Sequence, residues 1–168
     1  GIEEALAQKS VVVYTGKDGK QVEPTQAGTY KAVIRLQESA YWTEKTQETT
    51  FTIEPRKVSV VDLVAQAKVY DGTTAANLQE IVLNDATVNA AGVPIDNTGV
   101  LNGDSIYATG TGMTSSAAAG TVTLTVTGAA LKGNDAKNYE LVGTYAGEAF
   151  VIQRNQLKGD IADATYAY

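Results

Sequence analysis

Residues 119–127 read AGTVTLTVT, and this alternation is the stretch that decides the fold. From Val122 to Thr127 every second residue is apolar, and the residues between them are threonines. Successive side chains of a strand point to opposite faces, so a period of two predicts a β-strand with one face in a hydrophobic core. The tripeptide Ala-Gly-Thr also stands at 27–29, where it opens a second alternating run over 30–36. The two runs predict strands at corresponding places of a repeated unit.

Another segment recurs at nearly the same spacing. FTIE at 51–54 matches FVIQ at 150–153. Recurrence at a fixed period is the signature of tandem modules. We therefore expect a partial β module over residues 1–55, a complete β module over 56–153, and the first strand of a further repeat over 154–168.

The composition favours strands and excludes several kinds of chemistry. Tyr (9) outnumbers Phe (2) and Trp (1), and 16 Gly supply turn positions. The chain has no Cys and no His, which excludes disulfides, thiol nucleophiles, Ser-His-Asp triads and nearly every zinc site. With 13 Lys and Arg against 19 Asp and Glu, the net charge is −6, which disfavours nucleic acids and anionic membranes as partners. No apolar run approaches 18 residues, so we expect no membrane insertion of this chain.

The predicted fold class is all-β, as tandem immunoglobulin-like sandwiches of about seven strands each. A β-grasp-like module, in which a short helix crosses a mixed sheet, is the alternative, especially for the N-terminal part, where Ile2–Gln8 is the candidate helix. A long loop is expected over 84–102, where turn-forming residues are frequent. Strands are expected at 10–15, 29–37, 48–54, 57–63, 66–70, 80–84, 104–109, 121–127, 139–145 and 148–153.

Four segments carry a resemblance to a known family. They are KVYDGTT at 68–74, GDS at 103–105, AGT at 119–121 and LKGNDAKNYEL at 131–141. In this order they resemble the YDG domain, a repeat of large bacterial surface proteins and adhesins. The resemblance implies an extracellular location, at the bacterial cell surface or secreted, with neighbouring repeats of the same chain as partners and no catalysis. The family-motif residues are Tyr70, Asp71, Gly72, Gly103, Asp104, Ala119, Gly120, Thr121, Asn138 and Tyr139.

The N-terminal part resembles the related MBG-type surface repeat. The segments that carry this resemblance are YTG at 14–16, PTQAGTY at 24–30 and FTIEP at 51–55. The short asparagine-tyrosine turn of that family reads Ser39-Ala40-Tyr41-Trp42 here, so the match is looser.

We interpret the motif residues as structural. Tyr70 is expected to anchor a strand end in the core, and Asp71-Gly72 to form the turn. A self-formed isopeptide is a second interpretation, and it requires Lys57 or Lys68 beside a buried acid.

A calcium site is the only cofactor hypothesis that the sequence offers. Asp96, Asp104 and Asp135 stand in Gly- and Asn-rich loops, and carboxylate oxygens are the ligands that Ca²⁺ prefers. Their spacing matches no EF-hand loop, which favours ordinary turns. The acids are also scattered over turns, unlike the paired carboxylates of a glycoside hydrolase.

Two functions from different classes remain. The first is a non-catalytic structural or spacer repeat of a bacterial surface or adhesin-like protein. The second is a carbohydrate- or glycoprotein-binding module of a secreted protein, which would contact host or environmental glycans or proteins through Tyr41 and Trp42. Packing of Trp42 at a module junction is the structural alternative to that contact.

Overall fold

The computed structural model describes residues 10–38 and 43–157. In these ranges the chain forms twelve β-strands, one 3₁₀ turn, η1 (Ala136–Asn138), and no α-helix. The expected all-β class is confirmed, whereas the helix expected at Ile2–Gln8 lies outside the described residues. No helix in the described part has the length and apolar character that crossing a membrane requires. The chain divides into two compact units, the first comprising residues 1–58, 85–106 and 133–142, the second comprising 59–84, 107–132 and 143–168.

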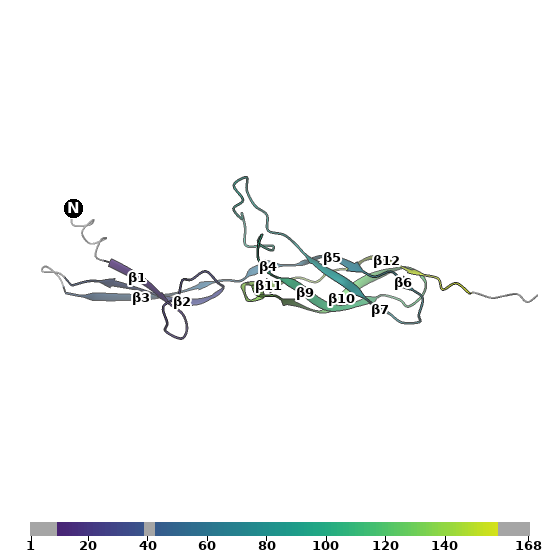
Figure 1. Ribbon diagram of the computed structural model, residues 1–168, viewed down its shortest axis with the longest axis horizontal. Helices are drawn as coiled ribbons and strands as arrows, with labels where there is room; N and C mark the ends of the chain where they lie inside the picture. The colour runs from purple at the N-terminus through teal and green to yellow at the C-terminus, as the bar shows by residue number, and fades with distance from the viewer. Residues whose placement is uncertain (1–9, 39–42, 158–168) are drawn as a thin grey trace, which may run out of the picture. The chain divides into compact units, whose positions relative to one another are not determined.

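A three-stranded antiparallel sheet occupies the N-terminal part of the first unit. Its strands are β1 (Ser10–Thr15), β2 (Gly28–Leu36) and β3 (Lys45–Ile53), in the order β1-β2-β3 (Figure 1). The strand expected at 10–15 is confirmed to the residue. β3 begins three residues earlier than expected, because its pairing with β2 continues to the end of that strand.

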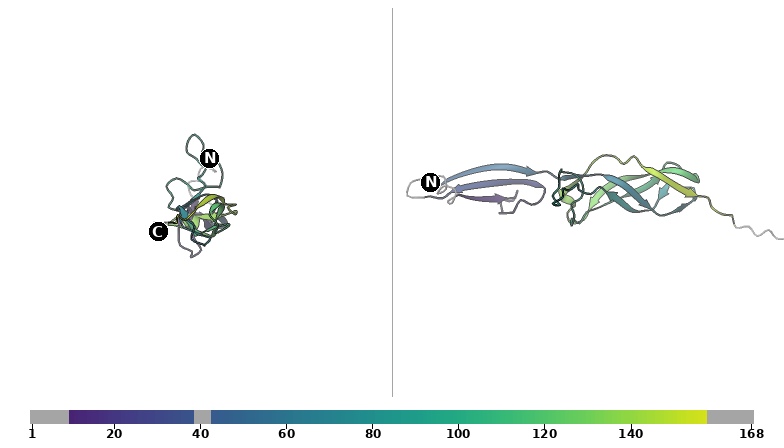
Figure 2. Two further views of the ribbon diagram at one scale, coloured as in Figure 1. Left: turned by 90° about the vertical axis from the view of Figure 1, so that its right-hand side faces the viewer. Right: turned by 90° about the horizontal axis from the view of Figure 1, so that it is seen from above.

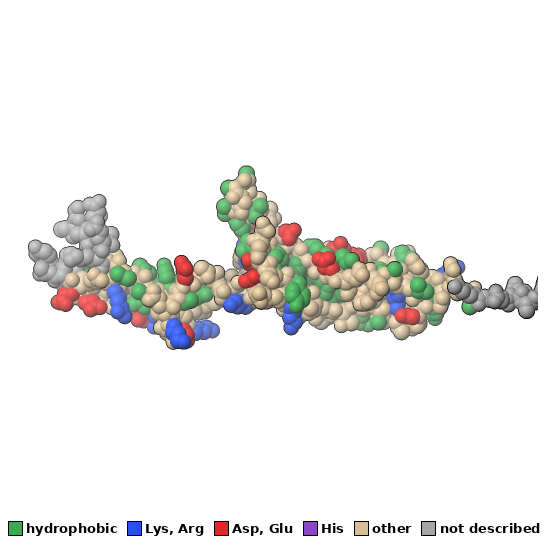
Figure 3. All heavy atoms as spheres, viewed as in Figure 1, with side chains coloured by type: hydrophobic (Ala, Val, Ile, Leu, Met, Phe, Trp, Pro, Cys, Tyr) green, Lys and Arg blue, Asp and Glu red, His purple; other side chains and the backbone are tan. Residues whose placement is uncertain are grey.

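The aromatic side chains of this sheet lie on one of its faces. The ring centroids of Tyr14 and Phe51 lie 5.9 Å apart, and those of Tyr30 and Phe51 lie 5.7 Å apart. Val12 and Ile34 are paired across β1 and β2, and they are 48% and 41% exposed. Figure 3 shows hydrophobic side chains at the surface over these strands. This apolar face is therefore half open to solvent.

The rest of the first unit contains a parallel strand pair and a long loop. β4 (Arg56–Val58) pairs in parallel with β11 (Tyr139–Leu141). The loop expected over 84–102 is held by isolated bridges, such as Asp85 with Val100, rather than by a regular strand.

Two sheets make up the second unit (Figure 2). The larger has the order β6-β12-β10-β9-β7, and the smaller pairs β5 with β8. β8 also lies beside β9, so the two sheets nearly close on one another. The strands are β5 (Val60–Ala65), β6 (Lys68–Val69), β7 (Ala75–Ala76), β8 (Leu78–Leu83), β9 (Tyr107–Thr114), β10 (Gly120–Lys132) and β12 (Glu148–Gln153).

The core of the second unit draws on both sheets. Leu63 of β5 and Ile81 of β8 pack with Ala108 of β9 and Leu124 of β10. Leu124 is fully buried, whereas its neighbour Thr123 is exposed. The threonine-spaced run of β10 thus places its apolar residues inward, as its period predicts.

Several expected strand boundaries are wrong, for two physical reasons. The strand expected at 57–63 is broken at Ser59, whose backbone N–H donates to Asn84 Oδ1 (2.8 Å), so the chain changes pairing partner there. The strands expected at 66–70 and 139–145 keep only two and three residues. The strand expected at 104–109 lies at 107–114 instead, because its glycines allow close packing: a Cβ on Gly112 would lie 2.7 Å from the Ala76 carbonyl oxygen.

β10 is five residues longer than the expected 121–127 at its C-terminal end. Its register with β9 shifts between Thr127 and Ala130, and Gly128 between them has φ +63°. The strand therefore passes through a β-bulge that the sequence presents as a strand end. β7 was not expected, because two alanines carry no period.

Candidate functional site

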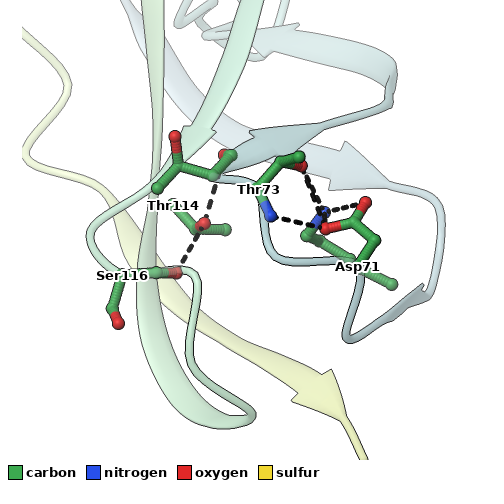
Figure 4. Close-up of polar contacts among 6 residues, drawn as sticks. Asp71, Thr73, Thr114 and Ser116 are labelled. Carbon is green, nitrogen blue, oxygen red and sulfur yellow. Dashed lines mark hydrogen bonds and ion pairs between the residues drawn. The ribbon is translucent and has the colours of Figure 1, made fainter. Parts of the chain in front are cut away.

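A buried lysine contacts Asp71 in the turn that follows β6. Figure 4 shows Asp71 and Thr73 of this turn. Lys68 is only 8% exposed, and its Nζ lies 2.7 Å from both carboxylate oxygens of Asp71. Asp71 Oδ1 also accepts hydrogen bonds from the backbone N–H (2.9 Å) and the hydroxyl (3.0 Å) of Thr73. Gly72 completes the turn with φ +78°, a conformation that favours glycine.

The contacts at this turn favour the charged carboxylate. The hydrogen bond from Lys68, followed by those from Thr73, lowers the pKa of Asp71 from 3.8 to about 2. The folded state therefore holds Asp71 ionised at pH values where an unfolded chain would protonate it. Because the folded pKa is depressed, the stability that this carboxylate contributes is present above pH 4 and is lost as the pH falls towards 2.

Asp71→Asn should destabilise the protein most at neutral pH and progressively less as the solution is acidified. The substitution leaves the buried Lys68 ammonium without its counter-charge, and acid removes the same charge from the wild type. Urea unfolding of both proteins between pH 7 and pH 2 measures the difference. In a Lys68→Met background, Asp71→Asn should change stability much less, and an equal loss in both backgrounds would contradict the pairing.

A second polar cluster lies next to this turn and was not foreseen. Thr114 is 5% exposed, and its Oγ1 lies 3.1 Å from the Thr74 carbonyl oxygen and 2.9 Å from that of Ser116 (Figure 4). Its backbone N–H also donates to Thr74 (2.8 Å). The cluster fastens the turn to the end of β9. Threonine occurs on both faces of these strands, so the sequence carries no signal for it.

Tyr70 does not lie in the core, and that expectation is wrong. It is 48% exposed, and its backbone N–H donates to the Gln153 carbonyl (2.8 Å). β6 ends at Val69. The alternation that points Lys68 inward therefore stops before Tyr70, which would occupy the next inward position.

Tyr139 links the motif residues of the first unit. It is 6% exposed, and its hydroxyl donates to Asp104 Oδ2 (2.6 Å) while accepting from the Leu101 backbone N–H (3.0 Å). Burial, followed by the hydrogen bond to Asp104, raises the pKa of the Tyr139 phenol. Gly103, with φ +96°, forms the turn that places Asp104.

Tyr139→Phe should lower the free energy of unfolding by about 1–3 kcal/mol, because it leaves a partly buried carboxylate and a backbone N–H unpaired. Urea unfolding at pH 7 measures this loss. Tyr107→Phe is the matched control, since Tyr107 is 57% exposed, and its effect should stay within about 0.5 kcal/mol. Equal effects of the two substitutions would show that the buried hydroxyl contributes no more to the free energy of unfolding than the exposed one.

The three carboxylates proposed for calcium are occupied separately. Asp135 Oδ2 accepts from the Ser105 N–H (2.8 Å), and Asp96 Oδ1 accepts from both donors of Thr98. The Thr98 contacts lower the pKa of Asp96. Within the described ranges the structure brings no three acidic side chains together as a metal site would require.

The structure also does not place Lys68 beside a buried acid, as the isopeptide hypothesis requires. The acid beside Lys68 is Asp71, whose side chain is 52% exposed rather than buried. Lys57, the other candidate, is itself exposed.

One carboxyl pair was missed, because its members lie on strands far apart in the sequence. Glu148 of β12 lies near Asp62 of β5 and accepts a hydrogen bond from the Tyr145 hydroxyl (2.9 Å). Burial, followed by the contact with Asp62, raises the pKa of Glu148. Burial and the bond to Glu148 raise the pKa of Tyr145 to about 12.

A polar hollow of about 400 Å³ lies in the first unit. Its lining includes Asp104, Asp135, Asn138 and Tyr139. Asp104, Asp135 and Tyr139 form the hydrogen bonds described above. The Asn138 side-chain oxygen accepts from the Ala27 backbone N–H (3.0 Å). Most of the polar groups lining the hollow are therefore engaged within the protein.

The remaining predicted residues fall into two groups. Ala119 ends the loop before β10, and Gly120 and Thr121 are the first two residues of this strand. Gly120 has φ +134°. Tyr41 and Trp42, the proposed glycan contacts, lie outside the described residues.

Comparison with known proteins identifies a domain family that matches part of the chain. No curated protein and no solved structure matches the chain. Residues 54–147, which contain the Lys68 turn and the Tyr139 cluster, match the YDG domain. This match covers more than half of the 168 residues, and the chain therefore belongs to the YDG domain family.

Proposed function

We propose that the chain is a non-catalytic spacer repeat of a bacterial cell-surface or adhesin-like protein. One observation carries the proposal: both carboxylates of the family motif bond to side chains of their own fold. Asp71 binds Lys68, and Asp104 binds Tyr139. In the described residues every buried side-chain nitrogen or oxygen has a hydrogen-bond partner. No unpaired buried atom there points to a ligand.

We further propose that the YDG domain is an immunoglobulin-like sandwich and that residues 1–55 are an MBG-type repeat. The core shared by β5, β8, β9 and β10 supports the first assignment. The aromatic cluster of Tyr14, Tyr30 and Phe51 supports the second, because all three belong to the segments that resemble the MBG repeat. An extracellular location follows from the family resemblance, with neighbouring repeats as partners.

A display experiment tests the spacer role. A small binding domain is anchored on a bacterial surface either directly or through this chain, and capture of ligand-coated beads is counted. We expect the chain to increase capture as much as an unrelated folded repeat of equal length. No gain over direct anchoring would contradict the proposal.

A glycan array and a panel of extracellular proteins test the competing function. We expect no saturable binding by the wild-type chain or by Trp42→Ala. Glycan binding that Trp42→Ala abolishes, with unchanged unfolding, would establish a carbohydrate-binding module instead.

A further inference from the structure

Two parallel strand pairs join the first strands of the β module over residues 56–153 to its last strands. In the first unit, β4 pairs with β11 through Arg56 with Tyr139 and Val58 with Leu141. In the second unit, β6 pairs with β12 through Lys68 with Ile152. Every other pair of named strands in the described residues is antiparallel.

The direction of these pairs decides how they respond to tension. Pulling on the chain draws β4 back towards Pro55 and draws β12 forward towards Arg154. These two strands belong to different pairs, since β4 pairs with β11 and β12 pairs with β6. Each is pulled along its own axis against a parallel partner inside the fold, so it must slide past that partner to leave the ladder. Sliding loads all hydrogen bonds of the ladder together, whereas pulling both strands from the same end breaks them one after another. The rate of forced unfolding is set by the height of this barrier.

One side of each ladder is shielded from water, whereas Lys57 of β4 and Val69 of β6 are exposed. Val58 and Tyr139 are 0% and 6% exposed, and Lys68 and Ile152 are 8% and 1% exposed. Water therefore has limited access to replace the ladder bonds while they are strained.

We propose that the β module over residues 56–153 is a mechanical clamp, in which the parallel β4–β11 and β6–β12 pairs resist tension applied along the chain. The inference rests on the proposed function for its setting, since a surface stalk is pulled at both ends. The clamp itself can be tested without reference to that function.

Pulling direction provides the first test. The chain contains no Cys, so handles can be attached at introduced cysteines without interference. Ala67→Cys with Asn155→Cys pulls β6 and β12 from opposite ends, and Ala67→Cys with Ala146→Cys pulls them from the same end. All three positions are exposed. In single-molecule force spectroscopy we expect the first pair of handles to require the higher unfolding force, and an equal or lower force would overturn the clamp.

A backbone substitution provides the second test. Tyr70→Pro removes the N–H that donates to the Gln153 carbonyl (2.8 Å), while Tyr70→Ala keeps this N–H and removes the same exposed ring. Held at constant force through positions 67 and 155, Tyr70→Pro should unfold about fivefold faster than Tyr70→Ala. Equal lifetimes would contradict the clamp. If Tyr70→Pro does not fold, the comparison of pulling directions still decides, and neither result alters the display experiment on the spacer role.

Discussion

Gly133→Ala should lower the free energy of unfolding by about 2–4 kcal/mol, through backbone strain and overlap together. Gly133 has φ +112°, which side chains rarely adopt. A Cβ at this position would overlap the Ser105 carbonyl oxygen and lie 3.0 Å from the Ile106 Cα. Both neighbours are backbone atoms, so neither can turn aside as a side chain would.

The consequences extend to the turn that carries Asp135. The Ser105 carbonyl accepts a hydrogen bond from the Asp135 N–H (3.2 Å), and the Ser105 N–H donates to the Asp135 side chain (2.8 Å). A methyl group at residue 133 would push these segments apart and weaken both bonds. The glycine within LKGND is thus required by close packing of two backbones.

Gly128→Ala is the matched control for this prediction. Gly128 has φ +63°, but a Cβ there would meet no heavy atom within 4 Å. Its substitution should cost about 1 kcal/mol, from backbone strain alone. Urea unfolding of the two variants at pH 7 separates the contributions, and a loss at Gly133 no larger than that at Gly128 would refute the overlap.

The parts of the fold that the sequence predicts well are those where a local period coincides with a sheet face. β1 and β12 were predicted to the residue, and β2 to within one residue at each end. Their registers follow from alternation, because one face of each strand must be less exposed than the other.

The errors arise where a tertiary contact decides the local conformation. Gly110 and Gly112 resemble loop residues, yet they lie within β9. Neighbouring segments of the same chain pass too close there for a side chain to fit. Lys68 turns inward, which hydrophobicity alone would not predict, because Asp71 supplies its counter-charge three residues later. Asp62 and Glu148 meet only after β5 and β12 have found their sheets. None of these contacts has a period that could be recognised in advance.

Leu124→Ala should lower the free energy of unfolding by about 2–5 kcal/mol, the range for truncating a fully buried leucine. Leu124 is 0% exposed and packs against Leu63, Ile81 and Ala108, which come from three other strands. Truncation would leave a cavity that these strands cannot close without breaking their own ladders. The loss should appear in urea unfolding as a lower midpoint with an unchanged slope.

Thr123→Ala is the control that makes this a test of the alternation itself. Thr123 is adjacent to Leu124 in β10 but is exposed, so its substitution should cost no more than about 1 kcal/mol of strand propensity. A strand buried on both faces would lose similar stability at both positions. Comparable losses would therefore mean that the threonine positions are also part of the core, and the period from which the fold was predicted would not define an inner and an outer face.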